Sequence, residues 1–260
     1  MNLRVLAAAA LVAATFGCGA TAMNPGHAVT APPAAAAAAA PLSGPATVPA
    51  ALAGATARSQ VVTHKLWEVG KKGRPVLLVH GWAGEAKEMA YLAENLATRG
   101  YAAWSVDLRP ADARVADTAR GMAQAIDDVL ARTGAQKLSL VCHSMGGLDS
   151  RYYLHMMWGA RKVDRLVTIA SPHHGTIWGG LAHGEAKIDL RPGSDLLALL
   201  DSFGQPLVPT TSIYSLTDQT VVPQNSAILA GAKNLPHWGL SHTSILRNAQ
   251  VLDEVLAALR

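Results

Sequence analysis

A serine among small residues is the clearest candidate for chemistry in this sequence. Ser144 lies in LVCHSMGG, residues 140–147, with two glycines after it and Cys142 two positions before it. The stretch is close to G-x-S-x-G, the sharp strand-to-helix turn that lifts a serine hydroxyl clear of a sheet. Cys142 is small enough to take the place of the first glycine. Ser144 is therefore a candidate nucleophile, although a plain S-x-G-G helix start would read the same way.

A serine nucleophile needs a histidine base, and the base needs an acid that fixes its tautomer. We do not expect His143 to be that base, because neighbouring side chains at a strand end point to opposite sides. Asp218 ends the run TTSIYSLTD, and His242 follows LPHWGLS, where it is predicted to begin the last helix. Alone, either could be an ordinary turn or surface residue. The order Ser144, Asp218, His242 is the one that this turn requires, so the three form the predicted catalytic set.

Two alternatives and an oxyanion site complete the candidate chemistry. His237 is a rival base, and Asp195 is a rival acid that reads better as the start of a short helix. Two backbone N–H groups would have to stabilise the developing negative charge. We expect one from Met145, after the nucleophile, and one from Trp82, in the loop VHGWAGE that His80 and Gly81 shape.

These residues need a sheet to bring them together. Apolar runs predict buried strands, amphipathic stretches predict helices between them, and one helix is bounded by Asp112 as N-cap and Gly134 as stop. The predicted strands cover 75–81, 101–108, 137–144, 163–171 and 210–218, and the helices cover 85–100, 112–134, 145–158 and 241–259. This alternation predicts an α/β fold: a mostly parallel central sheet with helices on both faces and its site at the carboxyl ends of the strands.

Three segments lie outside that alternation. Residues 1–22 have one charge, Arg4, before a run of about 12 apolar residues, too short to span a bilayer, and they predict a signal peptide. TFGC resembles a lipobox, so Cys18 could carry a lipid and attach the protein to a membrane; ATA, residues 20–22, offers ordinary cleavage instead. Residues 23–58 are an Ala/Pro-rich linker, and residues 59–260 are the predicted catalytic domain. Within that domain, residues 176–209 are predicted to form a small cap or lid.

Composition excludes several classes. Half of the residues are apolar and 15% are charged, which predicts a folded domain. The net charge of +4 has no basic cluster, so we expect no nucleic-acid partner. The only cysteines are Cys18 and Cys142, so no structural disulfide is expected, and Cys142 should be a free, buried thiol. Composition leaves the oligomeric state open.

Five separated blocks carry a family resemblance. VLLVHGWAG, VCHSMGGLDSRYY, VTIASPHHGT, IYSLTDQTVV and HTSILRNAQV occur in this order between residues 76 and 251. Together they resemble bacterial triacylglycerol lipases and carboxylesterases of the α/β-hydrolase fold, both the small Bacillus type and the Pseudomonas type. The resemblance implies a serine ester hydrolase with Ser144 as nucleophile, Asp218 as acid and His242 as base, and with Trp82 and Met145 as oxyanion donors. Together with the signal-peptide pattern, it predicts an exported enzyme, and no cofactor is expected. Cys142 departs from the family's Gly or Ala. No metal is expected: some Pseudomonas-type lipases hold a calcium ion, but this sequence offers no clear pair of Asp ligands beyond Asp218. His173 and His174 are given no catalytic role.

Three tryptophans lie in segments expected around a substrate pocket. They are Trp82, Trp178 and Trp238, of which the last two are predicted to bind substrate. The substrate itself is left open: a lipid ester is favoured, and a thioester, an amide or a phospholipid ester is an alternative. A lipid-anchored binding protein without catalysis, built on the same scaffold, is the alternative from another class.

Overall fold

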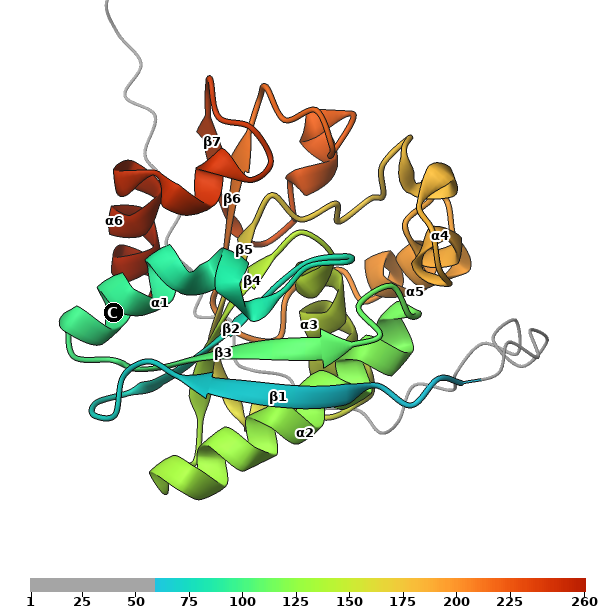
Figure 1. Cartoon of the computed structure of the whole chain (residues 1–260). Helices are drawn as coiled ribbons and strands as arrows, with labels where there is room; N and C mark the ends of the chain where they lie inside the picture. Colours follow the sequence, from blue (N-terminus) through green and yellow to red (C-terminus); the bar gives the residue numbers. More distant parts are fainter. Residues whose placement is uncertain (1–58) are drawn as a thin grey trace, which may run out of the picture. The chain divides into compact units, whose positions relative to one another are not determined.

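Seven strands form a single sheet in residues 59–260, the part of the chain that the computed structural model describes (Figure 1). The sheet order is β1-β3-β2-β4-β5-β6-β7, in which β1 is antiparallel to β3 and all other neighbours are parallel. The strands are β1 (Thr63–Glu68), β2 (Pro75–Val79), β3 (Ala102–Arg109), β4 (Leu138–His143), β5 (Val163–Ile169), β6 (Thr210–Ser215) and β7 (Lys233–His237). The predicted α/β fold is confirmed. The predicted signal peptide and linker, residues 1–58, lie outside the described residues.

The strands β2 to β6 are those predicted, and the two edge strands are not. In β1, half-buried residues alternate with exposed ones, and β7 contains Pro236. An edge strand pairs on one side only, so it tolerates proline and charged residues. Such a strand lacks the continuous apolar run from which the central strands were predicted.

Helices cover both faces of the sheet (Figure 1). On one face lie α1 (Ala90–Thr98), which follows the 3₁₀ turn η2 (Ala86–Met89), and α6 (Ala249–Ala258). On the other face lie α2 (Val115–Thr133) and α3 (Met145–Met156). None of the helices within 59–260 is long and apolar enough to cross a membrane.

The ends of α2 confirm one prediction and correct another. Gly134 ends the helix with φ 69°, and its N–H donates to Leu130 O at 2.9 Å, as the sequence predicts. Asp112 is not the N-cap, because the helix begins at Val115 and the Val115 N–H donates to the Asp189 carboxylate at 2.8 Å. An acid 74 positions away thus replaces the local cap that the sequence suggested.

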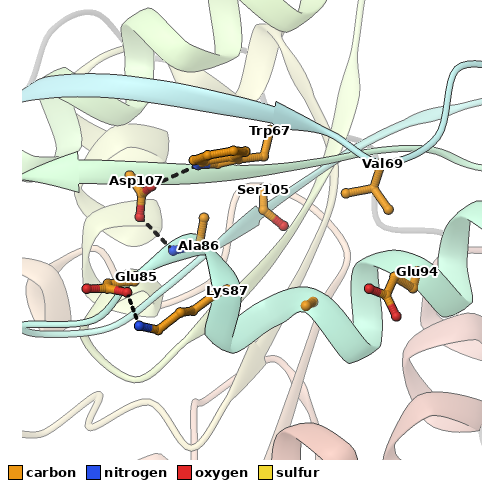
Figure 2. A pocket seen from close by; sticks show the side chains of 9 residues that line it. Trp67, Val69, Glu85, Ala86, Lys87, Glu94, Ser105 and Asp107 are labelled. Carbon is orange, nitrogen blue, oxygen red and sulfur yellow. Dashed lines mark hydrogen bonds and ion pairs between the residues drawn. The ribbon is translucent and has the colours of Figure 1, made fainter.

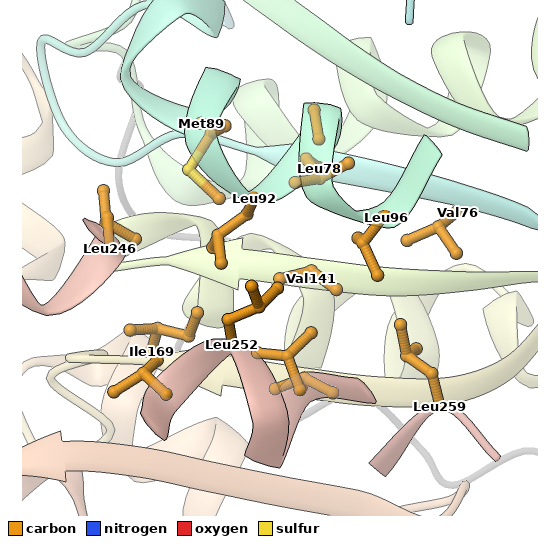
Figure 3. Packing of buried hydrophobic residues seen from close by; sticks show 14 of the residues in the cluster. Val76, Leu78, Met89, Leu92, Leu96, Val141, Ile169, Leu246, Leu252 and Leu259 are labelled. Atoms are coloured by element: carbon orange, nitrogen blue, oxygen red, sulfur yellow. The ribbon is translucent and has the colours of Figure 1, made fainter. Parts of the chain in front are cut away.

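Alternate residues of the central strands pack into the two opposite helical layers. In β2, Val76 and Leu78 join the cluster with α1 and α6, whereas Leu77 and Val79 join the cluster with α2 and α3. Figure 3 shows the first cluster, where leucines of α1 and α6 are directed onto the sheet. Complete burial of one leucine is worth about 1.5–3 kcal/mol. Burial on both faces explains why these strands are continuous apolar runs in the sequence.

The chain between β5 and β6 contains short helices rather than a long structureless loop. They are η4 (Gly179–Leu181), α4 (Ala186–Asp189) and α5 (Asp195–Ser202). Only α5 follows from the sequence pattern. Ser194 caps it, because its hydroxyl accepts the Leu197 N–H at 3.3 Å.

The C-terminal helix begins later than predicted. Residues 241–259 are not one helix: the 3₁₀ turn η6 (Ser244–Arg247) comes first, and α6 follows only after Asn248. Asn248 has extended backbone, and its side chain accepts the N–H groups of Gln250 and Val251 at 2.9 and 3.2 Å. His242 therefore lies in the loop before η6 and does not begin a helix.

The Asn248 side chain is expected to stabilise the start of α6. Asn248→Ala should lower the free energy of unfolding by about 1 kcal/mol, because two N–H groups at the start of α6 lose their acceptor. Urea unfolding monitored by circular dichroism measures the change. Asn248→Asp keeps an acceptor and should be close to neutral. An equal loss in both variants would contradict the capping role.

Candidate active site

Ser144 occupies the sharp turn where β4 meets α3. Its backbone angles, φ 53° and ψ −125°, are strained for a residue other than glycine. The Ser144 N–H donates to Ile169 O of β5 at 2.9 Å, and the Gly147 N–H donates to Ser144 O at 3.0 Å. A Cβ on Gly146 would lie 2.7 Å from His80 O, so this turn admits only glycine there. The turn therefore places the Ser144 hydroxyl at the carboxyl edge of the sheet.

Cys142 is the free, buried thiol that the sequence predicts. Its Sγ lies 2.9 Å from Ser150 Oγ, and the residue belongs to the core cluster beneath α2 and α3. Burial raises the pKa of Cys142 to about 12, so the thiol is not ionised at neutral pH.

His242 and Asp218 meet Ser144 although they lie 98 and 74 positions further along the chain. His242 Nε2 is 3.0 Å from Ser144 Oγ, and His242 Nδ1 is 2.8 Å from Asp218 Oδ2. Because a carboxylate can only accept, Nδ1 carries the proton and Nε2 presents its lone pair to the serine hydroxyl. The three predicted residues thus form a continuous hydrogen-bonded chain.

Asp218 is held in its ionised form by its donors. Burial alone would raise its pKa, but the bond from His242 and the N–H groups of Val221 and Thr220 outweigh burial, and the pKa of Asp218 is lowered. Oδ1 accepts the Thr220 and Val221 N–H groups at 2.7 and 3.0 Å, which leaves Oδ2 for the histidine. The residue is 2% exposed.

The loops that carry Asp218 and His242 are joined by hydroxyls that our sequence reasoning missed. Ser215 Oγ and Thr217 Oγ1 both donate to Leu240 O, at 2.6 and 3.2 Å. Thr176 Oγ1 donates to Thr220 O at 2.6 Å. Asp-x-Thr is a pattern typical of an Asx turn, so the Asp218–Thr220 bond was open to prediction. The long-range bonds carried no local signal.

His143 is not the base, but the reason given from the sequence is wrong. Its ring does not turn away from the site: it lies against His242, with ring centroids 4.7 Å apart. His143 Nε2 donates to His242 O at 2.9 Å. Strand alternation ends with β4, and the positive φ of Ser144 changes the direction of the chain there. His143 thus supports the backbone of the residue that contacts Ser144.

His143 should also make the fold sensitive to acid. Burial, followed by the neighbouring His242, lowers the pKa of His143 from 6.5 to about 3. Between these values the unfolded chain binds one more proton than the folded chain. The free energy of unfolding should therefore fall by about 1.4 kcal/mol per pH unit on this account as pH drops from 6.5 to 3. Urea unfolding at pH 7, 6, 5 and 4 gives the free energy of unfolding as a function of pH. This free energy should fall less steeply with decreasing pH in His143→Gln, by the equivalent of one proton, or about 1.4 kcal/mol per pH unit. The glutamine amide can still donate to His242 O. Identical slopes would rule this out.

The loop after β2 lies directly against the nucleophile. A Cβ on Gly81 would come within 2.6 Å of Ser144 Cβ. His80 fixes this loop: Nε2 accepts the Leu108 N–H at 3.0 Å, so Nδ1 carries the proton and donates to Gly81 O at 2.7 Å. Burial lowers the pKa of His80. Within residues 59–260, neither the Trp82 nor the Met145 N–H donates to a backbone acceptor, so both amides, which the sequence proposes as oxyanion donors, have no backbone partner.

An apolar cavity of about 230 Å³ opens at Ser144. Trp82 and Trp178 line it, as the sequence predicts, and Pro172, Leu181 and Val221 add apolar walls. Trp238 does not line this cavity: it is 77% exposed, in the loop after β7. Its predicted placement at the pocket is wrong.

The rival residues lie in other networks. His237 Nε2 is 2.7 Å from Glu254 of α6, and Asp195 is the exposed first residue of α5. His173 is buried against Thr168, and His174 bonds Asp201 at 3.0 Å. Arg151 of α3 links His173 to the partner of His174, because it donates to His173 O and to the Asp201 carboxylate, both at 3.0 Å. The segment SPHHGT is therefore fixed to α3 and α5, and its Pro172 and Thr176 face the Ser144 cavity.

The described residues contain no group of three or more His, Cys, Asp or Glu side chains suited to a metal ion.

The class of protein follows from this fold and from comparison with known proteins. The model of a family described as alpha/beta hydrolase fold matches residues 74–179, which include the β2 loop and Ser144. The strand order, the serine turn and the acid-histidine sequence agree with that match. The chain has the α/β-hydrolase fold.

Individual relatives are lipases. Over 128 residues the chain is 34% identical to lipase B of Pseudozyma antarctica, an alignment that covers 44% of this chain and 37% of that protein. It is 32% identical over 123 residues to a triacylglycerol lipase of Pseudarthrobacter phenanthrenivorans, covering 44% of this chain and 38% of that one. The matches thus span less than two-fifths of these lipases.

Solved structures agree with the sequence relatives. Aspergillus fumigatus lipase B superposes with a TM-score of 0.63 at 25% identity, covering 72% of this chain and 52% of that one. The mature lipase BlEst2 of Bacillus licheniformis has a TM-score of 0.65 at 20% identity, covering 75% of this chain and 98% of that one. The predicted resemblance to lipases and esterases of the α/β-hydrolase fold is confirmed.

Proposed function

We propose that this protein hydrolyses carboxylic esters through an acyl-enzyme on Ser144. The observation that carries the proposal is the hydrogen-bonded chain from Ser144 Oγ through His242 to Asp218, at the mouth of an apolar cavity. A structural hydroxyl would not need a strained backbone, an oriented imidazole and a buried carboxylate behind it. Strain kept at one residue together with an aligned base is typical of a nucleophile.

The proposed reaction uses each group in turn. His242 Nε2 takes the Ser144 proton while Oγ attacks the ester carbonyl carbon. The amides of Trp82 and Met145 stabilise the oxyanion. His242 then gives its proton to the leaving alcohol, and the acyl-enzyme forms. Water, deprotonated by His242, releases the acid and restores Ser144, while ionised Asp218 stabilises the imidazolium throughout.

The lining of the cavity favours an apolar acyl group. Tryptophan, leucine, proline and valine side chains surround Ser144, and they bury a hydrocarbon chain better than a charged one. Two of the relatives are triacylglycerol lipases by name, so lipid esters are the proposed substrate class. Thioesters, amides and phospholipid esters remain alternatives, as does a binding protein without catalysis.

A panel of substrates tests this proposal. Purified protein should turn over p-nitrophenyl esters, and chain-length preference together with emulsified triglycerides separates esterase from lipase behaviour. A fluorophosphonate probe should label Ser144, located by mass spectrometry of the digested protein. A protein that neither labels nor hydrolyses any member of the panel would support the non-catalytic alternative.

Gly81 offers a sharper test of the geometry around the nucleophile. Gly81→Ala should lower kcat for a p-nitrophenyl ester by about 100-fold, because the new methyl group would displace Ser144 from its place beside His242. Gly180→Ala is the matched control, since its Cβ would meet nothing closer than 3.9 Å. Equal activity in the two variants would contradict the proposed contact.

Export is a second part of the proposal and rests on the sequence alone. Residues 1–22 have the pattern of a signal peptide, with Cys18 as a possible lipid anchor before the linker. The mass of the mature N-terminus distinguishes cleavage before Met23 from a lipidated Cys18. An unprocessed N-terminus after expression in an exporting bacterium would remove this part of the proposal.

A further inference from the structure

A second cavity lies away from Ser144, on the edge of the sheet that β1 forms. Its volume is about 350 Å³, larger than that of the Ser144 cavity. Figure 2 shows it between β1 and β3 on one side and the η2–α1 segment on the other. None of the residues of the proposed reaction lines it.

The floor and one wall of this cavity are fixed in place. Trp67 of β1 and Ser105 of β3 are partners in the antiparallel register. Trp67 Nε1 donates to Asp107 Oδ2 at 2.8 Å, and the Ala86 N–H donates to Asp107 Oδ1 at 2.7 Å. The Asp107 carboxylate therefore links the Trp67 indole ring to the first residue of η2 and fixes their relative positions.

Two polar groups in this cavity have no partner among the described residues. Ser105 is 3% exposed, and its Oγ makes no hydrogen bond. In Figure 2 its side chain projects from β3 toward the α1 side of the cavity, where Glu94 lies. Within residues 59–260, Glu94 forms no ion pair, whereas the Glu85 carboxylate is paired with Lys87 at 2.5 Å. A buried hydroxyl without a partner is costly unless a ligand or water satisfies it.

Of the three carboxylates that line the cavity, only that of the exposed Glu94 has no cationic partner among the described residues. Lys87 pairs with Glu85, and the Arg109 guanidinium lies 3.5 Å from Asp107 and 3.7 Å from Glu85. Lys65 Nζ lies 4.0 Å from the centroid of the Trp67 ring. The remaining walls are the Trp67 ring and the aliphatic side chains of Val69, Ala86 and Ala90. An apolar body would contact these walls, and a positive charge would find Glu94 without competition from a protein cation.

We propose that this cavity binds a small primary ammonium compound with an apolar body. The apolar body packs on Trp67 and Val69, one ammonium N–H donates to Ser105 Oγ, and the charge faces the Glu94 carboxylate. The site is independent of the Ser144 chemistry, because it uses other residues and another part of the sheet.

Isothermal titration calorimetry with 2-phenylethylammonium, against its uncharged near-isostere 2-phenylethanol, tests the proposal at pH 7 and low salt. The ammonium compound should bind with a Kd of about 1 mM or below, and the alcohol about tenfold more weakly. Glu94→Gln should reduce that preference to about threefold or less, and added salt should weaken binding of the ammonium compound. Asp253→Asn, which removes an exposed carboxylate from α6, is the matched control and should keep the full preference.

Ser105→Ala separates binding from folding. It removes a buried hydroxyl without a partner, so it should leave the free energy of unfolding unchanged or slightly raised. It should nevertheless weaken binding of the ammonium compound by about fivefold. Equal binding of the two ligands, a preference that survives Glu94→Gln, or no heat of binding up to 10 mM ligand, about ten times the expected Kd, would each overturn the proposal. If the ammonium compound bound in the Ser144 cavity instead, its preference over the alcohol would survive Glu94→Gln.

Discussion

Ser144→Ala should reduce ester turnover by about 10⁴-fold or more and abolish labelling by a fluorophosphonate probe. The alanine retains the Cβ that the turn between β4 and α3 accommodates, and removes only the oxygen that lies 3.0 Å from His242 Nε2. The circular dichroism spectrum and the urea midpoint should therefore remain close to those of the parent protein. Rates with a p-nitrophenyl ester, measured at enzyme concentrations high enough to detect residual activity, give the magnitude.

Cys142→Ala is the companion variant, because Cys142 is the other nucleophilic side chain in the motif. Its thiol is buried, faces Ser150 and is protonated at neutral pH, so the variant should keep at least half of the activity. An inactive Cys142→Ala together with an active Ser144→Ala would reverse the assignment of the nucleophile. Loss of folding in Ser144→Ala alone would indicate a structural role for the hydroxyl.

The central strands and the order of the reactive residues could be predicted because each has a local cause. Strands buried on both faces are mainly apolar, as β2 shows along its whole length and β5 shows from Leu166 to Ile169 apart from Thr168. A serine between a buried strand and a helix needs small neighbours, which makes the turn visible as Gly146 and Gly147. Parallel strands then place Asp218 at the same edge of the sheet as Ser144. Connectivity alone therefore brings together residues 74 positions apart.

The errors come from contacts between segments that are distant in sequence. Asp189 rather than Asp112 accepts the N–H of Val115 at the start of α2, and the residues near position 115 do not indicate this long-range bond. Helical periodicity from residue 241 onward could not reveal that Asn248 would cap a later start. His143 is placed against His242 by the strained turn, a direction that strand alternation does not describe. In each case a side-chain hydrogen bond or a single strained residue overrides a pattern read from neighbours.

Trp238 and Trp67 show the same limit for binding surfaces. Neither tryptophan lies in a block that resembles the family, and only Trp238 lies in a segment that the sequence led us to expect around the pocket. The structure leaves Trp238 exposed and places Trp67 in a cavity, because the β1–β3 register sets Trp67 opposite Ser105. Since the sequence did not reveal β1 as a strand, it could not reveal this cavity.

Asp218→Asn should lower kcat by about 10⁴-fold with little change in the fold. The reason lies in the two donors on the other side of the carboxylate. The Thr220 and Val221 N–H groups require an acceptor at the Oδ1 position, so the amide oxygen of asparagine must take that place. The amide NH₂ then faces His242 Nδ1, where Oδ2 accepts a proton in the parent protein. His242 is forced into the other tautomer, with a hydrogen on Nε2 toward Ser144, and it can no longer accept the serine proton.

Asp195→Asn is the matched control, because it makes the same substitution at the rival acid at the start of α5 and should leave kcat unchanged. Rates for both variants and the extent of fluorophosphonate labelling after a fixed time distinguish a lost base from a lost fold. A decrease of less than tenfold in Asp218→Asn would mean that His242 is oriented by other contacts. The bond from His143 Nε2 to His242 O is one of these contacts, because it holds the backbone of His242 without touching its Nδ1. The double variant His143→Gln, Asp218→Asn would then separate the orientation of the ring from the choice of tautomer.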